Sequence, residues 1–167
     1  TDTSHIPQLP TVLGKSFSDS LSRMLHNFYI FNRKGRCLFY KEWDRPLNTM
    51  ADDPEEERKL VFGMLFSLKD MTSKLSPDKE GNDNLHFVKT NAFTLHHYQS
   101  PSGLMFVLNT NNNVPDMYTH LQHVYSQLYV ECIARNPLYR HKPDEPFKSV
   151  LFVDRLEEYL FSLVQAR

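Results

Sequence analysis

Histidines are the residues of this chain whose number and spacing first suggest chemistry. The 167 residues include eight histidines. His96 and His97 are neighbours in a strand-like run, so their side chains point to opposite faces and cannot bind one metal ion together. His120 and His123 share a face if their segment is helical, but no CxxC or HExxH motif accompanies them. We therefore interpret the histidines as solvated or hydrogen-bonded side chains, and we expect no metal site.

Cys37 would be the nucleophile of a thiol enzyme if a histidine lay beside it. It stands in an apolar run, and nothing in its neighbourhood marks an exposed, activated thiolate. Cys132, the other cysteine, also lies in an apolar run. We interpret both as small buried side chains in a reducing compartment, with no disulfide between them. A hydrolase or thiol enzyme stays an alternative, and it requires a histidine within about 3 to 4 Å of Cys37.

Acidic and glycine-rich motifs offer no stronger evidence for catalysis. Glu55, Glu56 and Glu57 are adjacent, but the start of a helix explains them fully, because carboxylates are stabilised at the positive end of the helix dipole. The sequence contains no Walker loop, no GxGxxG and no GxSxG. We therefore predict no catalytic residues, no cofactor and no enzymatic activity for the chain alone.

Composition favours a single domain that binds other proteins. The length of 167 residues fits one domain, and hydrophobic residues make up 40% of the chain. A net charge of -1 argues against a nucleic-acid partner, since nucleic-acid binders usually carry a basic face. No apolar run approaches the ~20 residues that span a bilayer, so we expect no membrane span. Residues 1–23 lack the apolar segment of a signal peptide.

Two regions follow from the distribution of polar residues. Residues 1–23 are rich in serine and proline, and we predict that they form a disordered or upstream extension, with Met24 as a plausible first residue. Residues 24–167 form the predicted domain.

The spacing of apolar residues changes along this domain, and these changes indicate where its strands and helices lie. Two aromatic-rich strands are predicted at about 27–32 and 36–42, joined by a turn in which Gly35 can adopt a positive φ. A helix is predicted from Asp53, as N-cap, to the residue before Pro77. Its expected core stripe repeats with helical spacing and comprises Leu60, Val61, Met64, Leu65, Leu68, Met71 and Leu75.

The second half of the chain continues with strands and ends with helices. Strand-like runs are predicted at 85–90, 93–98 and 104–109, followed by one helix that opens at Pro115 or Asp116 and another over 147–164. The resulting order is β-β-α-β-β-β-α-α. We predict an α+β fold in which a five-stranded antiparallel sheet is sandwiched by helices.

Surfaces for protein partners are the remaining functional feature. Phe62 and Phe66 lie beside the stripe of the first helix and make that helix apolar over more of its circumference than one sheet requires. Aromatic residues are enriched at interfaces, and an open sheet has two edges that must be covered or paired. The alternative for the aromatic residues, including Tyr118, Tyr125 and Tyr129 of the second helix, is packing in the core.

Four segments together resemble a known family. They are FYIFNRKGRCLFYKEWDRPL, ERKLVFGMLFSLKDMTSKLSP, TLHHYQSPSGLMFVLNT and YSQLYVECIARNPLY. From about Met24 to the C-terminus, the chain resembles the sybindin-like, longin-fold subunits of the TRAPP vesicle-tethering complex. Residues 1–23 find no counterpart, and family members are expected to differ in residues 48–54 and in the loop at 78–84.

The resemblance implies a longin-like fold and a non-catalytic structural role. It implies other TRAPP subunits as partners, including a second longin-fold subunit paired through sheet edges. It also implies that the assembled complex, and not this chain alone, acts as a guanine-nucleotide exchange factor for a Rab GTPase of the early secretory pathway. The corresponding location is cytoplasmic, peripheral at endoplasmic reticulum and cis-Golgi membranes, in ER-to-Golgi and intra-Golgi transport.

The predicted partner contacts lie on two surfaces. One is the outer side of the first helix, with Phe62, Phe66 and Lys69. The other is the sheet edge near Cys37, Phe39 and Lys41. Two alternatives outside TRAPP use the same fold: a fusion regulator whose longin domain folds back on a coiled coil, which needs a heptad segment and a membrane anchor, and a cargo adaptor.

Overall fold

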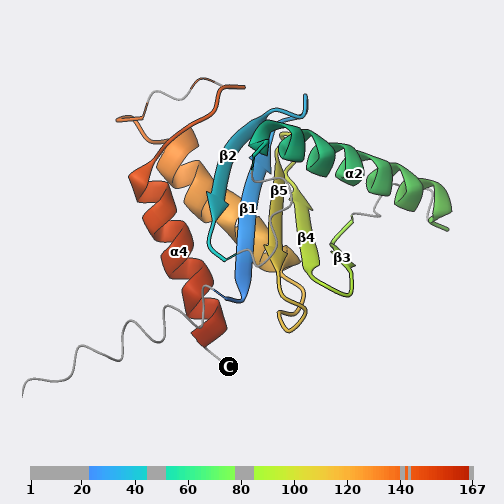
Figure 1. The fold of residues 1–167 in the computed structure, drawn as a ribbon. Helices are drawn as coiled ribbons and strands as arrows, with labels where there is room; N and C mark the ends of the chain where they lie inside the picture. Colours follow the sequence, from blue (N-terminus) through green and yellow to red (C-terminus); the bar gives the residue numbers. More distant parts are fainter. Residues whose placement is uncertain (1–22, 45–51, 78–84, 140–141, 143, 166–167) are drawn as a thin grey trace, which may run out of the picture.

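A central antiparallel sheet with helices on both faces organises the structure (Figure 1). The structure is a computed structural model, and it describes residues 23–44, 52–77, 85–139, 142 and 144–165. The predicted extension at 1–23, the segment 48–54 and the loop at 78–84 therefore lie wholly or largely outside the described residues. The elements are β1 (Leu25–Phe31), β2 (Cys37–Glu42), α2 (Pro54–Leu75), β3 (Phe87–Lys89), β4 (Thr94–Gln99), β5 (Met105–Thr110), α3 (Tyr118–His123), η1 (Val124–Ala134) and α4 (Val150–Gln165).

The five strands lie in the order β2-β1-β5-β4-β3, and every neighbouring pair is antiparallel. The fold is thus the predicted longin-like α+β sandwich. β1 and β5 occupy the centre, while β2 and the three-residue β3 form the two edges. The register between β1 and β2 shifts next to Phe31, where a bulge accommodates one extra residue of β2.

Alternation along β1 divides the apolar side chains between two layers. Phe28 and Ile30 face α3, η1 and α4, and Tyr29 and Phe31 face α2. The first layer forms the larger core, which includes Phe106, Leu121 and other buried residues of both helices and strands. Both faces of β1 are covered, since all four side chains are fully buried.

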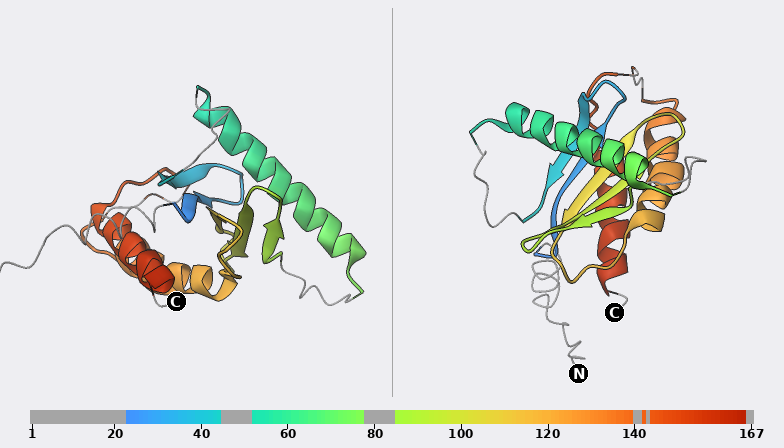
Figure 2. Two further views of the ribbon diagram at one scale, coloured as in Figure 1. Left: turned by 60° about the horizontal axis from the view of Figure 1, so that its bottom comes forward. Right: turned by 90° about the vertical axis from the view of Figure 1, so that its right-hand side faces the viewer.

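The helix α2 begins as its sequence predicts. The side chain of Asp53 accepts a hydrogen bond from the N–H group of Glu56 at 3.0 Å, and Pro54 occupies the first turn. α2 crosses the sheet obliquely, and its C-terminal part extends beyond β3 (Figure 2). A helix that overhangs its sheet cannot bury its last turns against that sheet.

The helical segment that covers the larger core contains a change in helical pitch. α3 continues directly into η1, a helix with the wider i→i+5 turns of a π-helix. Apolar residues at helical spacing along this segment are all buried: Met117, Leu121, Val124, Leu128 and Cys132. α4 then packs on the same face of the sheet and contributes Phe152, Leu156 and Leu160 to the core.

Candidate protein-interaction surfaces

An exposed row of apolar side chains follows one side of α2. Val61, Leu65 and Leu68 pack against the sheet, and of these only Leu65 is completely buried. Four exposed apolar residues lie beside this packed face, and their exposed fractions range from 40% to 80%. We call them the α2 stripe: Leu60, Met64, Met71 and Leu75. The prediction that these four residues belong to the core is therefore wrong, because α2 is rotated away and overhangs the sheet.

The two phenylalanines predicted on the outer side of α2 have different surroundings. Phe66 is 65% exposed. Phe62 instead points inward, with its ring 5.8 Å from the ring of Phe31 and against the backbone at Gly35. The prediction that Phe62 lies on the outer side is wrong, since the β1–β2 turn curls under the helix and gives the ring a packing partner.

Lys69, the third residue predicted on this surface, fastens α2 to the sheet. Its ammonium group donates a hydrogen bond to the side-chain oxygen of Gln99 at the end of β4. Burial lowers the pKa of Lys69. Lys69 thus has an intramolecular role, whether or not a partner also reaches it.

The edge strand β3 has backbone groups that point away from β4 and that no other described residue hydrogen-bonds. His97 donates its N–H to the carbonyl of His86, and Thr90 donates to Phe93, both at 2.9 Å. Hydrogen-bonded residues alternate along an antiparallel pair, so the N–H and C=O groups of Phe87 and Lys89 point away from β4. The side chain of Phe87 is also exposed. An apolar overhang and an open edge therefore lie on the same side of the molecule (Figure 2).

At the opposite edge, β2 carries the other three predicted contact residues. Phe39 is buried and belongs to the core, where its ring meets Phe152 edge-on at 5.0 Å. Lys41 forms an ion pair with Glu157 at 3.2 Å, and this pair holds α4 beside the strand. The side chain of Phe39 faces α4 because Phe39 pairs with Ile30 and shares that residue's face of the sheet.

The thiol of Cys37 lacks the surroundings of a nucleophile. It is half-buried and contacts the carbonyl oxygen of Phe39 at 3.2 Å. Burial raises its pKa, although the nearby Arg58 acts in the opposite direction. A raised pKa is the reverse of what an activated thiolate requires. Both cysteines are unpaired thiols.

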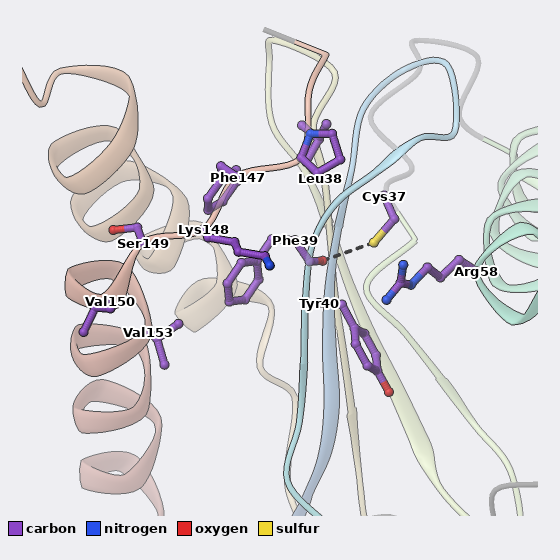
Figure 3. A pocket seen from close by; sticks show the side chains of 11 residues that line it. Cys37, Leu38, Phe39, Tyr40, Arg58, Phe147, Lys148, Ser149, Val150 and Val153 are labelled. Atoms are coloured by element: carbon purple, nitrogen blue, oxygen red, sulfur yellow. Dashed lines mark hydrogen bonds between the residues drawn. The ribbon is translucent and has the colours of Figure 1, made fainter. Parts of the chain in front are cut away.

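A groove runs between β2 and the start of α4 (Figure 3). We call it the β2 groove, and its volume is about 610 Å³. It is lined by residues 37–40 of β2, Arg58 of α2, and residues 146–150 and 153 at the start of α4. The lining is mainly apolar, and no carboxylate of a described residue contributes to it.

The histidines on β4 are held by hydrogen bonds on opposite faces, as predicted. His96 lies within 3.0 Å of the hydroxyl of Thr110, and its other ring nitrogen accepts from the N–H of Met117. His97 lies 2.9 Å from the carbonyl of Leu85. Burial lowers the pKa of both rings to about 4. Among the described residues, no group of histidine, cysteine or carboxylate side chains could hold a metal ion.

The tyrosines of the second helical segment pack inward. Tyr129 is buried, and its ring meets that of Phe106 at 5.9 Å. Tyr118 and Tyr125 are half-buried against the same core. Core packing thus accounts for all three.

Comparison with known proteins places this sandwich in a family. Residues 25–163 match the family described as Sybindin-like. The chain belongs to the Sybindin-like family. A relative from Dictyostelium discoideum, named trafficking protein particle complex subunit 1, is 36% identical over 82% of this chain and 94% of its own length. The Homo sapiens protein of the same name is 41% identical over 83% of this chain and 93% of its own length.

Two further similarities are more distant. Trafficking protein particle complex subunit 4 of Dictyostelium discoideum is 26% identical over 69% of this chain and 82% of its own length. Among solved structures, gliding protein MglB from Thermus thermophilus matches over 97% of this chain and 96% of its own, with 14% identity and a TM-score of 0.41. In this Sybindin-like chain, no helix among the described residues has the length and apolar character needed to cross a membrane.

The exposed surfaces of this Sybindin-like chain were only partly visible in the sequence. The α2 stripe was present as an apolar arc that is wider than one sheet can cover, but its rotation relative to the sheet was not encoded locally. The β2 groove brings together Arg58 and Val150, which are far apart in the sequence. No local signal could have paired them.

Proposed function

We propose that this chain is a non-catalytic structural subunit of the TRAPP vesicle-tethering complex and acts in vesicle trafficking. The predicted TRAPP role is confirmed by relatives in Dictyostelium and mammals that carry the name of one TRAPP subunit along nearly their whole length. The absence of catalysis is part of the proposal. It is supported by the surroundings of Cys37, His96 and His97, which are packed and hydrogen-bonded in ways that suit structural side chains.

The observation that carries the structural role is the combination of the α2 stripe with the open edge of β3. A second longin-fold subunit can extend the sheet from β3 by backbone pairing and cover the overhang of α2 with its own helix. The similarity to a TRAPP subunit of a different number supports a partner of the same fold. The pairing would bury Leu75, which is 80% exposed here.

The assembled complex is the unit to which we assign nucleotide exchange. In this proposal, the complex acts on a Rab GTPase of the early secretory pathway at endoplasmic reticulum and cis-Golgi membranes. Exchange follows if the complex binds the nucleotide-free GTPase more tightly than the nucleotide-bound form, because that difference in affinity favours release. The isolated chain is expected to be inactive.

Co-purification of variant chains with the other TRAPP subunits tests the α2 stripe. In the double variant Met71→Asp/Leu75→Asp, two charges enter the proposed interface, and recovery of the partner subunits should fall at least about tenfold. Ser73→Asp is the matched control, since it adds a charge to an exposed position of the same turns, and it should assemble normally. Full recovery with the double variant would contradict the proposed pairing surface.

Phe66 tests the opposite flank of α2. Phe66→Asp should leave the fold intact, because 65% of the side chain is already exposed, and it should weaken recovery of partner subunits if that flank is also covered. Far-UV circular dichroism establishes whether the variant is folded. Loss of folding together with assembly would show that Phe66 acts within the domain.

A further inference from the structure

The edge strand β2 has a row of backbone groups that point away from β1, and one group at the end of this row is already hydrogen-bonded. Trp43 donates its N–H to the carbonyl of His26 at 2.9 Å. Alternation in the antiparallel pair then directs the N–H and C=O groups of Tyr40 and Glu42 away from β1. Within the described residues, no other backbone group is hydrogen-bonded to them on that side. The edge is thus open over these two residues.

The chain itself forms the first bond along this edge. Phe147 donates its N–H to the carbonyl of Leu38 at 2.9 Å, just before the chain enters α4. The ring of Phe147 stacks on Phe39 at 5.4 Å, which fixes the segment in place. The edge therefore has the geometry that accepts an added strand, and the next two bonding positions remain available in line with the first.

The two walls of the β2 groove differ in chemistry. Toward α4 the wall is apolar, with Val153 half-buried and Val150 78% exposed. Toward α2, the guanidinium of Arg58 lies 5.0 Å from the ring centre of Tyr40. Figure 3 shows Arg58 entering from the α2 side, opposite the valines.

The positive charges of the groove lack counter-ions within it. Arg58 and Lys148 line the groove, and neither forms an ion pair among the described residues. The whole chain has a net charge of -1, so this local excess of positive charge is not a general property of the surface. Charge complementarity therefore points to an acidic occupant.

We propose that the β2 groove binds an extended acidic peptide segment of a partner protein as an added strand beside β2. Side chains alternate between the two faces of a strand. An occupant hydrogen-bonded to Tyr40 and Glu42 therefore directs every second side chain toward Val150 and Val153, and the intervening ones toward Arg58. The segment carries apolar residues alternating with glutamate or aspartate. This site is at the opposite edge from the α2 stripe and does not rest on the pairing proposed there.

A titration with a synthetic peptide tests the site directly. The probe is Ser-Gly-Val-Glu-Val-Glu-Val-Gly-Ser, added to the ¹⁵N-labelled full chain and followed by NMR. Saturable shifts of the backbone amides of Tyr40, Glu42 and Val150 are expected at peptide concentrations up to about 1 mM. Replacement of both glutamates by lysine should weaken binding about tenfold or more. The absence of shifts at these amides, or equal binding of the two peptides, would overturn the proposal.

A charge reversal at Arg58 tests whether the groove selects acidic side chains or binds peptides nonspecifically. The Arg58→Glu chain should prefer the lysine peptide over the glutamate peptide, because the repulsive and attractive pairs exchange places. The Lys59→Glu chain is the matched control, since Lys59 is exposed on the same helix and does not line the groove. It should keep the original preference. If Arg58→Glu and Lys59→Glu change the preference equally, the groove does not select the acidic side chains of the peptide.

N-methylation tests strand addition itself. Methyl groups are placed either on the peptide nitrogens of one alternating set of residues or on those of the other set. Only the set that faces β2 donates to the edge, so one methylated peptide should lose binding and the other should retain it. Equal behaviour of both would exclude an added strand. Failure of these tests leaves co-purification through α2 unaffected, so the two proposals are judged separately.

Discussion

Gly35 fixes the path of the chain between β1 and β2. Its φ is +82°, and a Cβ atom there would come within 2.8 Å of the ring of Phe62. Gly35→Ala therefore combines an unfavourable left-handed conformation with displacement of a packed ring, and we expect a loss of about 2 to 4 kcal/mol in the free energy of unfolding. Urea unfolding monitored by tryptophan fluorescence measures it.

Gly103 provides the matched comparison for this turn. Its φ is +90°, and the nearest atoms to an added Cβ belong to the side chain of Arg33, which is exposed and donates a hydrogen bond to the carbonyl of Ser102. Because an exposed side chain can shift at little cost, Gly103→Ala should cost mainly the unfavourable backbone conformation, about 1 to 2 kcal/mol. If the two variants lose equal free energy of unfolding, displacement of the Phe62 ring has no energetic cost, which contradicts the importance of its packing against Phe31.

His96 and His97 should make stability depend on pH below neutrality. Burial lowers the pKa of each ring from 6.5 to about 4, so the unfolded chain binds more protons than the folded chain between these values. The free energy of unfolding is then fully present above about pH 6.5 and falls as the pH drops toward 4. Between pH 7 and pH 5, each histidine should contribute a loss of about 2 kcal/mol.

Replacement of His97 checks the origin of this pH dependence. His97→Gln removes one titrating ring, and the loss in the free energy of unfolding between pH 7 and pH 5 should shrink by about 2 kcal/mol. Gln122→Asn, which changes an exposed side chain that does not titrate, should leave the loss unchanged. An identical pH dependence in wild type and His97→Gln would show that protonation of this ring is not linked to unfolding.

At the scale of elements, Asp144 fastens the segment before α4 to the β1–β2 turn. Its carboxylate accepts hydrogen bonds from Asn32 at 3.0 Å and from Lys34 at 2.9 Å. These partners hold the pKa of Asp144 below its usual value, with the contact to Lys34 as the main cause. They also position Phe147, whose N–H bonds to β2. Asp144→Ala should therefore accelerate hydrogen exchange at the Phe147 amide about tenfold.

Asp144→Asn distinguishes the role of the carboxylate charge from that of the hydrogen bonds. The amide oxygen can still accept from Asn32, so exchange at Phe147 should lie between wild type and Asp144→Ala. Amides at the centre of β5 should exchange at the wild-type rate in both variants, because local opening does not require global unfolding. Uniform acceleration throughout the sheet would instead indicate loss of global stability.

Local signals in the sequence determine much of the architecture. Asp53, Pro54 and Pro77 predicted where α2 begins and ends, and the structure places the helix at Pro54–Leu75. The alternation in β1 and the apolar spacing of α3 and η1 coincide with the side chains that are buried. These features depend on residues close together in the chain, and together they were sufficient for the element order and the sandwich.

Features set by distant packing could not be predicted in the same way. Leu60 and Met64 repeat with core-like spacing, but α2 crosses the sheet at an angle that leaves them exposed. Phe62 is half-buried because its ring packs against the turn at Gly35. The π-helical turns of η1 also carry no evident local signature, since apolar spacing alone gives an ordinary helix.

The whole molecule has unequal layers. The face covered by α3, η1 and α4 contains the large core, whereas α2 covers the other face with a smaller cluster and leaves the α2 stripe exposed. An exposed apolar row beside an open sheet edge is a recognised site of association. The isolated chain should therefore associate with itself through the surface that a partner subunit normally covers.

Sedimentation of the isolated full chain checks this last prediction. The wild type should form dimers or larger species as its concentration rises, and Met71→Lys/Leu75→Lys should shift it toward the monomer, because charges on the stripe oppose burial. Ser73→Lys adds charge at a neighbouring exposed position and should associate like the wild type. Addition of the partner subunit should suppress self-association of the wild type by mass action. If the wild type stays monomeric at all concentrations and Met71→Lys/Leu75→Lys still assembles fully, the exposed row has no role in association.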